Sequence, residues 1–360
     1  MIDIQTQKNV GVLLVNLGSP ESPDPVAVGR YLGEFLMDEH VIDLPRPVRQ
    51  LLVRGMIVPF RSRRSARAYR SIWRDDGSPL IVISRKLTGQ LQRELEVPVE
   101  VAMRYGQPSI EEGLKKLHTR CGSDLRDVFV VPLYPHYAMS TVRSIEVAVE
   151  EALLRTEMQV NVTVKETFYQ DTSYIHALAE SIHPYVEEPF DHILFSYHGL
   201  PERHLKKTDP TGAHCLRVEN CCNVASSAHR YCYRHQVFDT TNQVTKTLNI
   251  PDEKWSNAFQ SRLGPDSWLK PFAAERVEGL AAAGVSKLLV VCPAFVSDCL
   301  ETLEEVGIGM KRMFLDAGGR SFQLIPCLND HAHWIEALRG WCVGWQRDVE
   351  QRRTADEPVA

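Results

Sequence analysis

The sequence predicts an α/β protein made of two Rossmann-like domains, each a parallel sheet flanked by helices. Short apolar segments alternate with segments whose apolar residues recur every three or four positions, the pattern of strands followed by amphipathic helices. The alternation runs to about residue 165 and then starts again. A chain of 360 residues is also long for one core, which favours two domains.

The first half opens with an apolar strand, which we expect to end in the turn Asn16-Leu-Gly-Ser-Pro20 because glycine and proline interrupt regular structure. The segment Val-Phe-Val-Val in a later strand has the continuous apolar character of a strand covered on both faces. The expected strands are 10–15, 99–103 and 127–133, and the expected helices are 26–36, 48–57, 80–95, 110–117 and 144–157.

The second half repeats this order and is interrupted by an irregular stretch that holds four cysteines. The expected strands are 162–167, 193–195, 256–260, 287–291 and 321–325, and the expected helices are 174–186, 272–283, 300–314 and 331–350. The predicted domains are therefore 1–165 and 166–328, the second with a cysteine-rich insertion at 208–240. Residues 329–360 form a C-terminal helical extension.

Composition narrows the class of protein. The formal net charge of −5 argues against nucleic acid as a partner. The N-terminus lacks a basic region followed by an apolar one, and no apolar run approaches the roughly 18 residues of a spanning helix. Nine cysteines without a secretory signal argue against a disulfide framework. We therefore expect a cytoplasmic protein with reduced thiols or metal-bound thiolates.

His198 is the first candidate functional residue. It stands just beyond the apolar strand 193–195, in a stretch that we expect to interrupt the strand from Ser196 onward and to stop it at Gly199. In open α/β sheets, ligands bind beyond the carboxyl ends of the strands, and histidine exchanges protons near neutral pH. A surface or structural role is the ordinary alternative for a histidine, and both interpretations stay open here.

Asp298, Glu301 and Glu305 are spaced three and four residues apart, which places three carboxylates on one face of a helix. Asp298 followed by Glu301 also has the spacing of a capping box, so spacing alone favours a purely local role. The preceding strand, however, aims this helix start at the same sheet edge as His198. Carboxylates and an imidazole meeting there would bind a divalent cation or relay protons.

Cys215, Cys221, Cys222 and Cys232 lie in one polar stretch. They lack the close pairing of cysteines that most zinc sites use, which leaves an iron–sulfur cluster as the better interpretation. Histidines in the same stretch are spare ligands, so zinc stays open. Four free thiols there would be an oxidation liability.

An arginine-rich stretch, Arg61 to Arg70, follows the apolar patch Met56-Ile-Val-Pro-Phe60. A solvated helix face is the ordinary outcome for such a stretch. Alternatively, the two segments together form a lip that grips an apolar ligand carrying carboxylates.

Seven segments of the chain resemble the ferrochelatase family, whose members insert ferrous iron into protoporphyrin IX. They are Asn16–Pro20, Gly77–Leu80, Met103–Gly106, Leu133–Tyr137 with Ser140 and Thr141, Ser196–Pro201, Gln260–Gly264 with Trp268, and Asp298–Glu305. No single segment is specific, but seven in the family's order are. The resemblance covers about residues 9–340.

The resemblance implies a chelatase-like fold, with porphyrin bound between two domains and a last helix that reaches back to the first. It implies a lyase, protoporphyrin ferrochelatase, that performs the terminal step of haem biosynthesis. His198 matches the active-site histidine and Glu301 the acid that faces it across the porphyrin, so both are expected at the metal. Asp298 and Glu305 match further acids of the proton or metal path.

Other matched positions belong to the porphyrin pocket. Arg104 and Tyr105 match a pair on the opposite wall, and Trp268 matches an aromatic wall. The resemblance also places Ser78 and one of two arginines, Arg63 or Arg64, near a propionate.

The chain departs from the family's pattern at several points. Leu17 stands in the pocket where some members carry a Met or Tyr considered a metal ligand, and leucine cannot bind a metal. Cys299 stands where some members carry histidine, and is either a soft ligand or packing. The C-terminal cysteines of the animal enzymes are absent. The four-cysteine stretch instead resembles a bacterial class in which four internal cysteines hold a [2Fe–2S] cluster.

The resemblance therefore implies protoporphyrin IX and Fe²⁺ as substrates, and a [2Fe–2S] cluster with a structural or sensing role. Monomer and homodimer both stay open. Peripheral contact with the inner membrane is expected through four apolar residues, Leu51, Leu52, Met56 and Phe60. The alternatives are a cobalt or nickel chelatase, a non-catalytic iron–sulfur redox sensor, and a haem carrier on the same scaffold.

Overall fold

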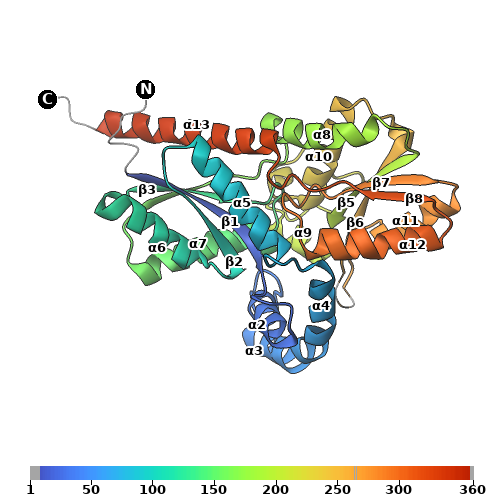
Figure 1. Cartoon of the computed structure of the whole chain (residues 1–360), viewed down its shortest axis with the longest axis horizontal. Coiled ribbons are helices and arrows are strands. Elements are labelled where there is room, and N and C mark those ends of the chain that lie inside the picture. The colour runs from blue at the N-terminus through green and yellow to red at the C-terminus, as the bar shows by residue number, and fades with distance from the viewer. Residues whose placement is uncertain (1–8, 263, 265, 357–360) are drawn as a thin grey trace.

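The computed structural model describes residues 9–262, 264 and 266–356, and contains two four-stranded parallel sheets flanked by helices (Figure 1). The first sheet has the order β2-β1-β3-β4, and the second has the order β6-β5-β7-β8. The first strand of each half is second from the edge in both sheets. The strands are β1 (Val10–Ser19), β2 (Val99–Gly106), β3 (Asp127–Pro132), β4 (Asn161–Val164), β5 (His192–His198), β6 (Trp255–Gln260), β7 (Lys287–Val291) and β8 (Ser321–Leu324).

Helices connect the strands, and the predicted α/β fold class is confirmed. The α-helices are α2 (Pro25–Leu36), α3 (Arg46–Gln50), α4 (Val58–Ile72), α5 (Pro79–Glu94), α6 (Ile110–Cys121), α7 (Ser144–Thr156), α8 (Thr172–Val186), α9 (Glu202–Thr208), α10 (Tyr233–Thr247), α11 (Ala273–Ala282), α12 (Lys311–Asp316) and α13 (Ala332–Asp356). Three π-helical segments precede α-helices: η1 (Leu51–Ile57), η3 (Met139–Arg143) and η6 (Glu301–Met310). Short 3₁₀ turns are η2 (Gly122–Asp124), η4 (Ser227–Tyr231) and η5 (Asp252–Lys254).

Several strands are longer than the sequence predicted. The expected turn at Asn16 is instead the end of β1, because residues 16–19 keep pairing with β2. Gly18 permits this, since its φ of 112° is unfavourable for other residues and a Cβ there would lie 1.7 Å from the carbonyl oxygen of Tyr105. The expected interruption at Ser196 is also wrong, because β5 pairs with β6 through His198.

The helices also differ from the predicted pattern. The arginine-rich stretch is helical throughout α4, and the predicted helix 48–57 divides into α3 and η1. The helices α9 and α10 were not predicted. Because α10 begins at Tyr233, the irregular cysteine segment ends before residue 240. Leu263, part of one family-like segment, lies outside the described residues.

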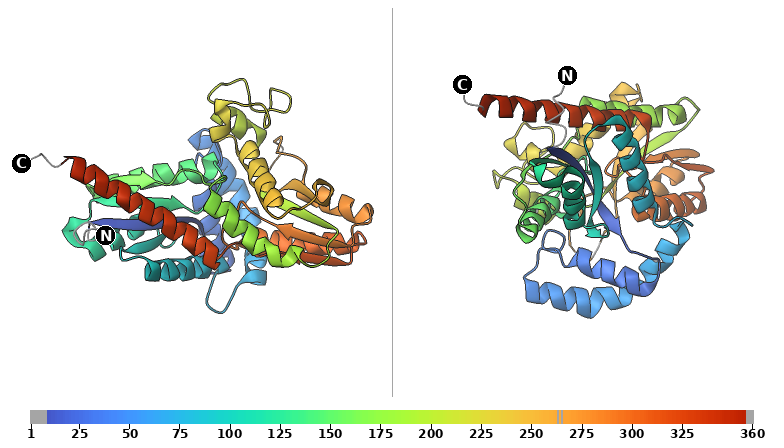
Figure 2. Two further views of the ribbon diagram at one scale, coloured as in Figure 1. Left: turned by 90° about the horizontal axis from the view of Figure 1, so that it is seen from above. Right: turned by 60° about the vertical axis from the view of Figure 1, so that its left-hand side comes forward.

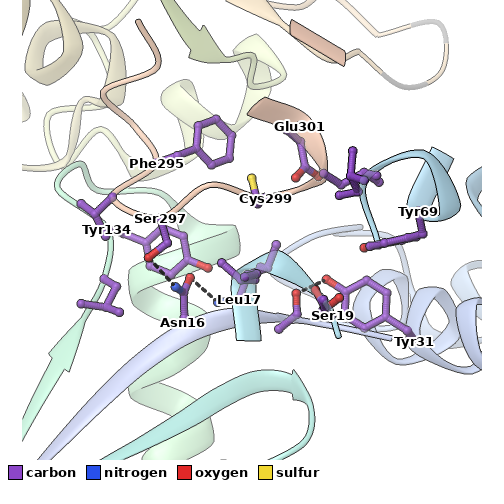
Figure 3. Close-up of a pocket in the computed structure, with 17 residues that line it drawn as sticks. Asn16, Leu17, Ser19, Tyr31, Tyr69, Tyr134, Phe295, Ser297, Cys299 and Glu301 are labelled. Carbon is purple, nitrogen blue, oxygen red and sulfur yellow. Dashed lines mark hydrogen bonds between the residues drawn. The ribbon is translucent and has the colours of Figure 1, made fainter. Parts of the chain in front are cut away.

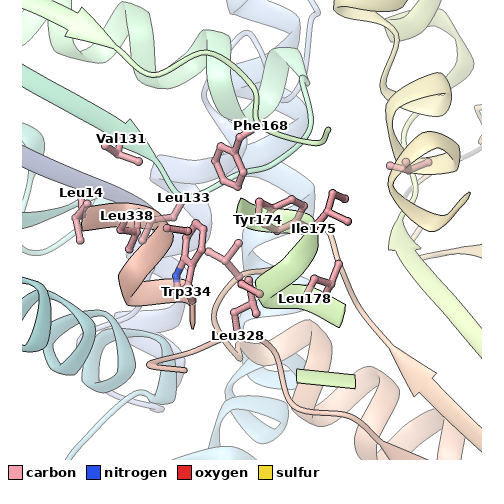
Figure 4. Close-up of a cluster of buried hydrophobic side chains, with 14 of the residues drawn as sticks. Leu14, Val131, Leu133, Phe168, Tyr174, Ile175, Leu178, Leu328, Trp334 and Leu338 are labelled. Carbon is pink, nitrogen blue, oxygen red and sulfur yellow. The ribbon is translucent and has the colours of Figure 1, made fainter. Parts of the chain in front are cut away.

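One hydrophobic cluster extends through both halves of the molecule (Figure 4). It includes Leu14 and Val131 from the first sheet and Phe195 from the second, with Phe168 and Trp334 between them. The helix α13 lies along the first half and meets α8 of the second half, as Figures 1 and 2 show. Trp345 of α13 stacks on Phe129 of β3, with 5.1 Å between ring centroids. The last helix therefore reaches back to the first half, as predicted.

A lobe formed by α2, α3, η1 and α4 projects beyond the carboxyl edge of the first sheet (Figure 2). Helix α4 contacts η6 of the second half. The lobe therefore bridges the two halves at the sheet edges. None of the helices that the structure describes combines the length and the hydropathy needed to cross a bilayer.

Candidate active site

A cavity of about 30 Å³ lies where the carboxyl ends of the two sheets meet (Figure 3). The first half contributes the end of β1 and Tyr134, which follows β3. The second half contributes residues 295–297, 299 and 300, which lie between β7 and η6, and Glu301, the first residue of η6. Helix α4 adds Tyr69 and Ile72. The strand-end rule for open α/β sheets therefore holds for both halves at once.

Asn16 connects the two walls of the cavity. Its side-chain amide donates to the hydroxyl of Ser84 at 3.1 Å and to that of Ser297 in the second half at 3.4 Å. Its carbonyl oxygen accepts from the backbone N–H of Leu17 at 2.9 Å. Asn16 is buried, so these bonds satisfy both ends of its amide.

Glu301, the first residue of η6, lines the cavity among phenolic hydroxyls (Figure 3). Burial raises the pKa of Tyr31, Tyr69 and Tyr134, and the negative charge of Glu301 contributes to each shift. Burial and then Glu301 likewise raise the pKa of the Cys299 thiol. These raised pKa values keep the three phenols and the Cys299 thiol neutral.

His198 ends β5 with one ring nitrogen fixed. Its Nδ1 lies 2.6 Å from the carbonyl oxygen of Gly199. Because a carbonyl oxygen can only accept, Nδ1 carries the proton in the neutral ring and Nε2 holds the lone pair. The ring packs edge-on near Phe295, a cavity residue, with 6.3 Å between centroids. His198 is therefore arranged as a proton acceptor at Nε2.

Glu305 lies one helical turn after Glu301 and links it to His198. Its carboxylate accepts from the backbone N–H of Ser261 at 2.9 Å and from the Ser261 hydroxyl. Burial raises the pKa of Glu305, and repulsion by Glu301 adds to the shift, while attraction by His198 opposes it. The structure thus places Glu305 within electrostatic reach of both His198 and Glu301. His198 does not itself line the cavity.

Asp298 is separated from this group, contrary to the prediction of three carboxylates on one helical face. It precedes the helix, and its carboxylate is buried. The carboxylate accepts from the Thr302 hydroxyl at 3.0 Å, the Asn329 amide at 2.7 Å and the Cys327 backbone at 3.4 Å. It also lines a different cavity. Asp298 therefore fixes the start of η6.

Arg104 and Tyr105 lie behind the cavity wall. Arg104 forms an ion pair with Asp38 at 2.5 Å, and the buried Tyr105 hydroxyl donates to the same carboxylate at 2.8 Å. Hydrogen bonding by Ser144 and the charge of Arg104 keep the pKa of Asp38 low, although burial opposes them. These two residues support the wall through Asp38 and do not line the cavity.

The remaining predicted pocket residues divide into two groups. Leu17 and the buried Ser78 line the cavity, and Trp268 packs beside the end of β5, 3.3 Å from where a Cβ on Gly199 would lie. Arg63 and Arg64 are exposed on α4 and do not line the cavity.

Sequence reasoning missed other residues around this site. Asn16 and Tyr134 follow apolar strands, so the strand-end rule could have found them. Tyr31 and Tyr69 carry no such signal, because they occupy apolar positions of amphipathic helices. Ser261 lies in the family-like segment Gln260–Gly264, but that segment gave it no role, which only its contact with Glu305 reveals.

The four cysteines of the irregular segment are buried close together. Hydrogen bonds from the thiols of Cys222 and Cys215 lower the pKa of Cys232 to about 6. The Cys221 sulfur accepts from the backbone N–H of Leu216 at 3.4 Å. The lowered pKa of Cys232 favours the thiolate, the form that binds metals.

Within the described residues, no three or more His, Cys, Asp or Glu side chains are arranged to hold a single metal ion. A [2Fe–2S] cluster does not require such a group, because two thiolates bind each of its two irons. The donor chemistry fits it: the Arg234 guanidinium lies 3.5 Å from the Cys222 sulfur and 4.0 Å from that of Cys221. Such N–H donors stabilise thiolate ligands.

A family model and individual relatives were found to be similar to this chain, and they agree with each other. The family model described as Ferrochelatase matches residues 9–343. A ferrochelatase of Pseudomonas entomophila (strain L48) is 47% identical over 333 residues, which cover 92% of this chain and 98% of the relative. A ferrochelatase of Pseudomonas fluorescens (strain SBW25) is 48% identical, with 92% and 96% covered.

Among solved structures, "SirB from Bacillus subtilis with Fe3+" aligns over 92% of this chain and 93% of that one, with a TM-score of 0.50 and 12% identity. This likeness concerns the fold alone. The match of the family model and the identity to its members agree with each other over nearly the whole described chain. By these criteria, the chain belongs to the ferrochelatase family.

Proposed function

We propose that this chain inserts ferrous iron into protoporphyrin IX to form protohaem. The observation that carries the proposal is the orientation of His198. Its Nδ1–H is held by the Gly199 carbonyl, which leaves Nε2 as an acceptor in a ring that interacts with Glu305 and packs near the cavity residue Phe295. Family membership supplies the reaction, and this geometry supplies a base for it.

The reaction releases two protons for each iron inserted. Fe²⁺ replaces the protons on two pyrrole nitrogens, so the nitrogens must be deprotonated as the metal arrives. His198 Nε2 accepts these protons in turn. Glu305 lies beside His198 and receives protons from it, and Glu301 attracts the cation from the cavity wall. A cleft that binds a bent porphyrin better than a flat one exposes the nitrogen lone pairs.

The cavity must open before a tetrapyrrole can bind. Its volume of about 30 Å³ corresponds to a single water molecule, whereas sites for ligands of this size have volumes of roughly 300–1,000 Å³. Helix α4, which contributes Tyr69 and Ile72 to the wall, is joined to the rest of the lobe. Displacement of this lobe would widen the junction without breaking either sheet.

The test is zinc insertion into protoporphyrin by the purified protein, with zinc as a stable substitute for ferrous iron. His198→Ala is expected to abolish insertion while porphyrin still quenches tryptophan fluorescence. His183→Ala changes an exposed histidine on α8 and is the matched control. Near-normal turnover by His198→Ala would refute the assignment. Wild-type protein that binds haem but inserts no metal would favour a carrier, and insertion only of cobalt or nickel into another tetrapyrrole would favour a different chelatase.

We also propose that Cys215, Cys221, Cys222 and Cys232 bind a [2Fe–2S] cluster. The support is the donor set, which combines four neighbouring buried thiols with N–H donors to sulfur. When bound, the cluster would cross-link the irregular segment, and metal insertion requires no electron from it. Cys215→Ser is expected to bleach the visible absorption of the cluster, whereas Cys121→Ser, outside this segment, should leave the spectrum unchanged.

We further propose that the lobe contacts the cytoplasmic surface of the inner membrane, which holds the poorly soluble substrate. Leu51, Met56 and Phe60 are 72%, 57% and 80% exposed, and Leu52 beside them is half-buried. Exposed arginines of α4 flank this patch and suit anionic lipid. Phe60→Ser is expected to reduce co-sedimentation with phosphatidylglycerol vesicles, and Leu154→Ser, equally exposed on α7, should not.

A further inference from the structure

We propose that Tyr233 is a positioning residue that fixes the strand end carrying His198 and couples it to the cysteine segment. The proposal rests on the proposed function, because the role of His198 comes from there. The phenolic hydroxyl of Tyr233 donates a hydrogen bond to the backbone carbonyl of His198 at 2.9 Å. This contact joins residues 35 positions apart in the chain.

The strand end at His198 is held by several backbone contacts, and Tyr233 completes them. The Gly199 N–H donates to the carbonyl of Gln260 at 2.6 Å. A Cβ on Gly199 would lie 2.9 Å from that oxygen and 3.0 Å from the Ser261 carbonyl, so the peptide lies tight against β6. The Gly199 carbonyl then holds the His198 ring. The peptide between His198 and Gly199 therefore determines where Nε2 points.

The side chain of Tyr233 is held in place by its surroundings. It is 5% exposed, and its ring packs edge-on against the buried His136 at 5.9 Å. The phenol is the donor in its contact with His198, because a carbonyl oxygen can only accept. A fixed donor of this kind restrains the carbonyl that accepts from it.

Tyr233 also directly follows Cys232, which caps the start of α10. The Cys232 sulfur interacts with the thiols of Cys215 and Cys222. One peptide bond thus separates a proposed cluster ligand from the residue that holds His198. A shift of Cys232 when the sulfurs lose their shared metal would move Tyr233, and with it the carbonyl of His198.

The first experiment changes only the hydroxyl. Tyr233→Phe is expected to lower kcat for zinc insertion roughly tenfold, while KM for porphyrin and the visible cluster absorption stay at wild-type values. Hydrogen exchange at the Gly199 amide is expected to accelerate. Tyr231→Phe is the matched control, because it removes a hydroxyl on the other side of Cys232. Wild-type kcat and wild-type Gly199 exchange in Tyr233→Phe would overturn the positioning role.

The second experiment tests the coupling without changing Tyr233. Cys215→Ser is expected to bleach the cluster and to accelerate Gly199 exchange. In the Tyr233→Phe background, Cys215→Ser should cause no further acceleration, because the connection is already lost. A bleached cluster with unchanged Gly199 exchange would overturn the coupling. Failure of the proposed function is separate, since it would leave the wild-type protein without insertion, whereas amide exchange reports positioning without any turnover.

Discussion

Asp298 and Glu305 have similar sequence signals but different surroundings, and the difference lies in where η6 begins. The spacing of Asp298, Glu301 and Glu305 predicts a shared face only if all three are inside one α-helix. The helix begins after Asp298, and its first ten residues are π-helical. The sequence pattern does not reveal a π-helical segment. It could therefore predict that the three carboxylates are neighbours, but not that Asp298 is separated from Glu301 and Glu305.

Replacement of Asp298 is expected to act mainly on stability. Asp298→Ala leaves buried donors of Thr302 and Asn329 without their acceptor, so the free energy of unfolding should fall by about 2 kcal/mol. Urea unfolding followed by circular dichroism measures this change. Asp316→Ala, on the exposed end of α12, is the control and should change stability little. An Asp298→Ala protein of full stability without activity would instead indicate a direct catalytic role.

Buried Glu305 is expected to make the stability of the folded protein depend on pH. Because burial raises its pKa in the folded state, the folded protein binds the proton more tightly than the unfolded chain. The stabilising contribution of this proton is complete below the unfolded value of 4.5 and is lost as pH rises through the raised folded value. Glu305→Gln should therefore gain stability relative to wild type on going from pH 4 to pH 7. Thermal unfolding at both values measures this difference, and a difference independent of pH would contradict it.

Element lengths depend on contacts that a local pattern does not contain. The helix α10 was missed because its buried face is partly polar: Gln236, Thr240 and Thr241 are fully buried and hydrogen-bonded. Apolar periodicity therefore fails there, although the element is regular. The strand β1 was predicted too short because glycine usually ends strands, whereas Gly18 here allows β2 to approach.

The close approach of β1 and β2 at Gly18 can be tested by substitution. In Gly18→Ala the new Cβ meets the backbone of β2, which cannot rotate away, so stability should fall by about 3 kcal/mol or more. Gly33→Ala is the matched control, since open space surrounds that position in α2. It should raise stability by about 0.5–1 kcal/mol. Chemical denaturation measures the free energy of unfolding of both variants. Equal changes in the two variants would mean that the close approach at Gly18 is unimportant.

The whole molecule repeats one strand order twice. The sequence predicted two halves from the restarted alternation of strands and helices, but it wrongly assigned the strand at 162–167 to the second half, since β4 pairs with β3 in the first sheet. It could not predict how the halves join. The halves share a hydrophobic cluster in which Trp334 of α13 lies near Phe168 (Figure 4). Helix α13 contacts α8 of the second half and, through Trp345 on Phe129, β3 of the first. Shared packing of this kind favours joint unfolding of the two halves, even though each has its own sheet.

Cooperative unfolding is therefore expected for the whole chain. Urea transitions followed by tryptophan fluorescence and by far-ultraviolet circular dichroism should coincide, because no part of the shared cluster can open alone. Trp345→Ala removes a buried ring from the contact between α13 and β3, and should lower stability by about 3–5 kcal/mol. Leu154→Ala, 80% exposed, should change it by less than about 0.5 kcal/mol. Two separated transitions in the wild-type protein would contradict this, because they would mean that α13 only covers the halves and does not unite them.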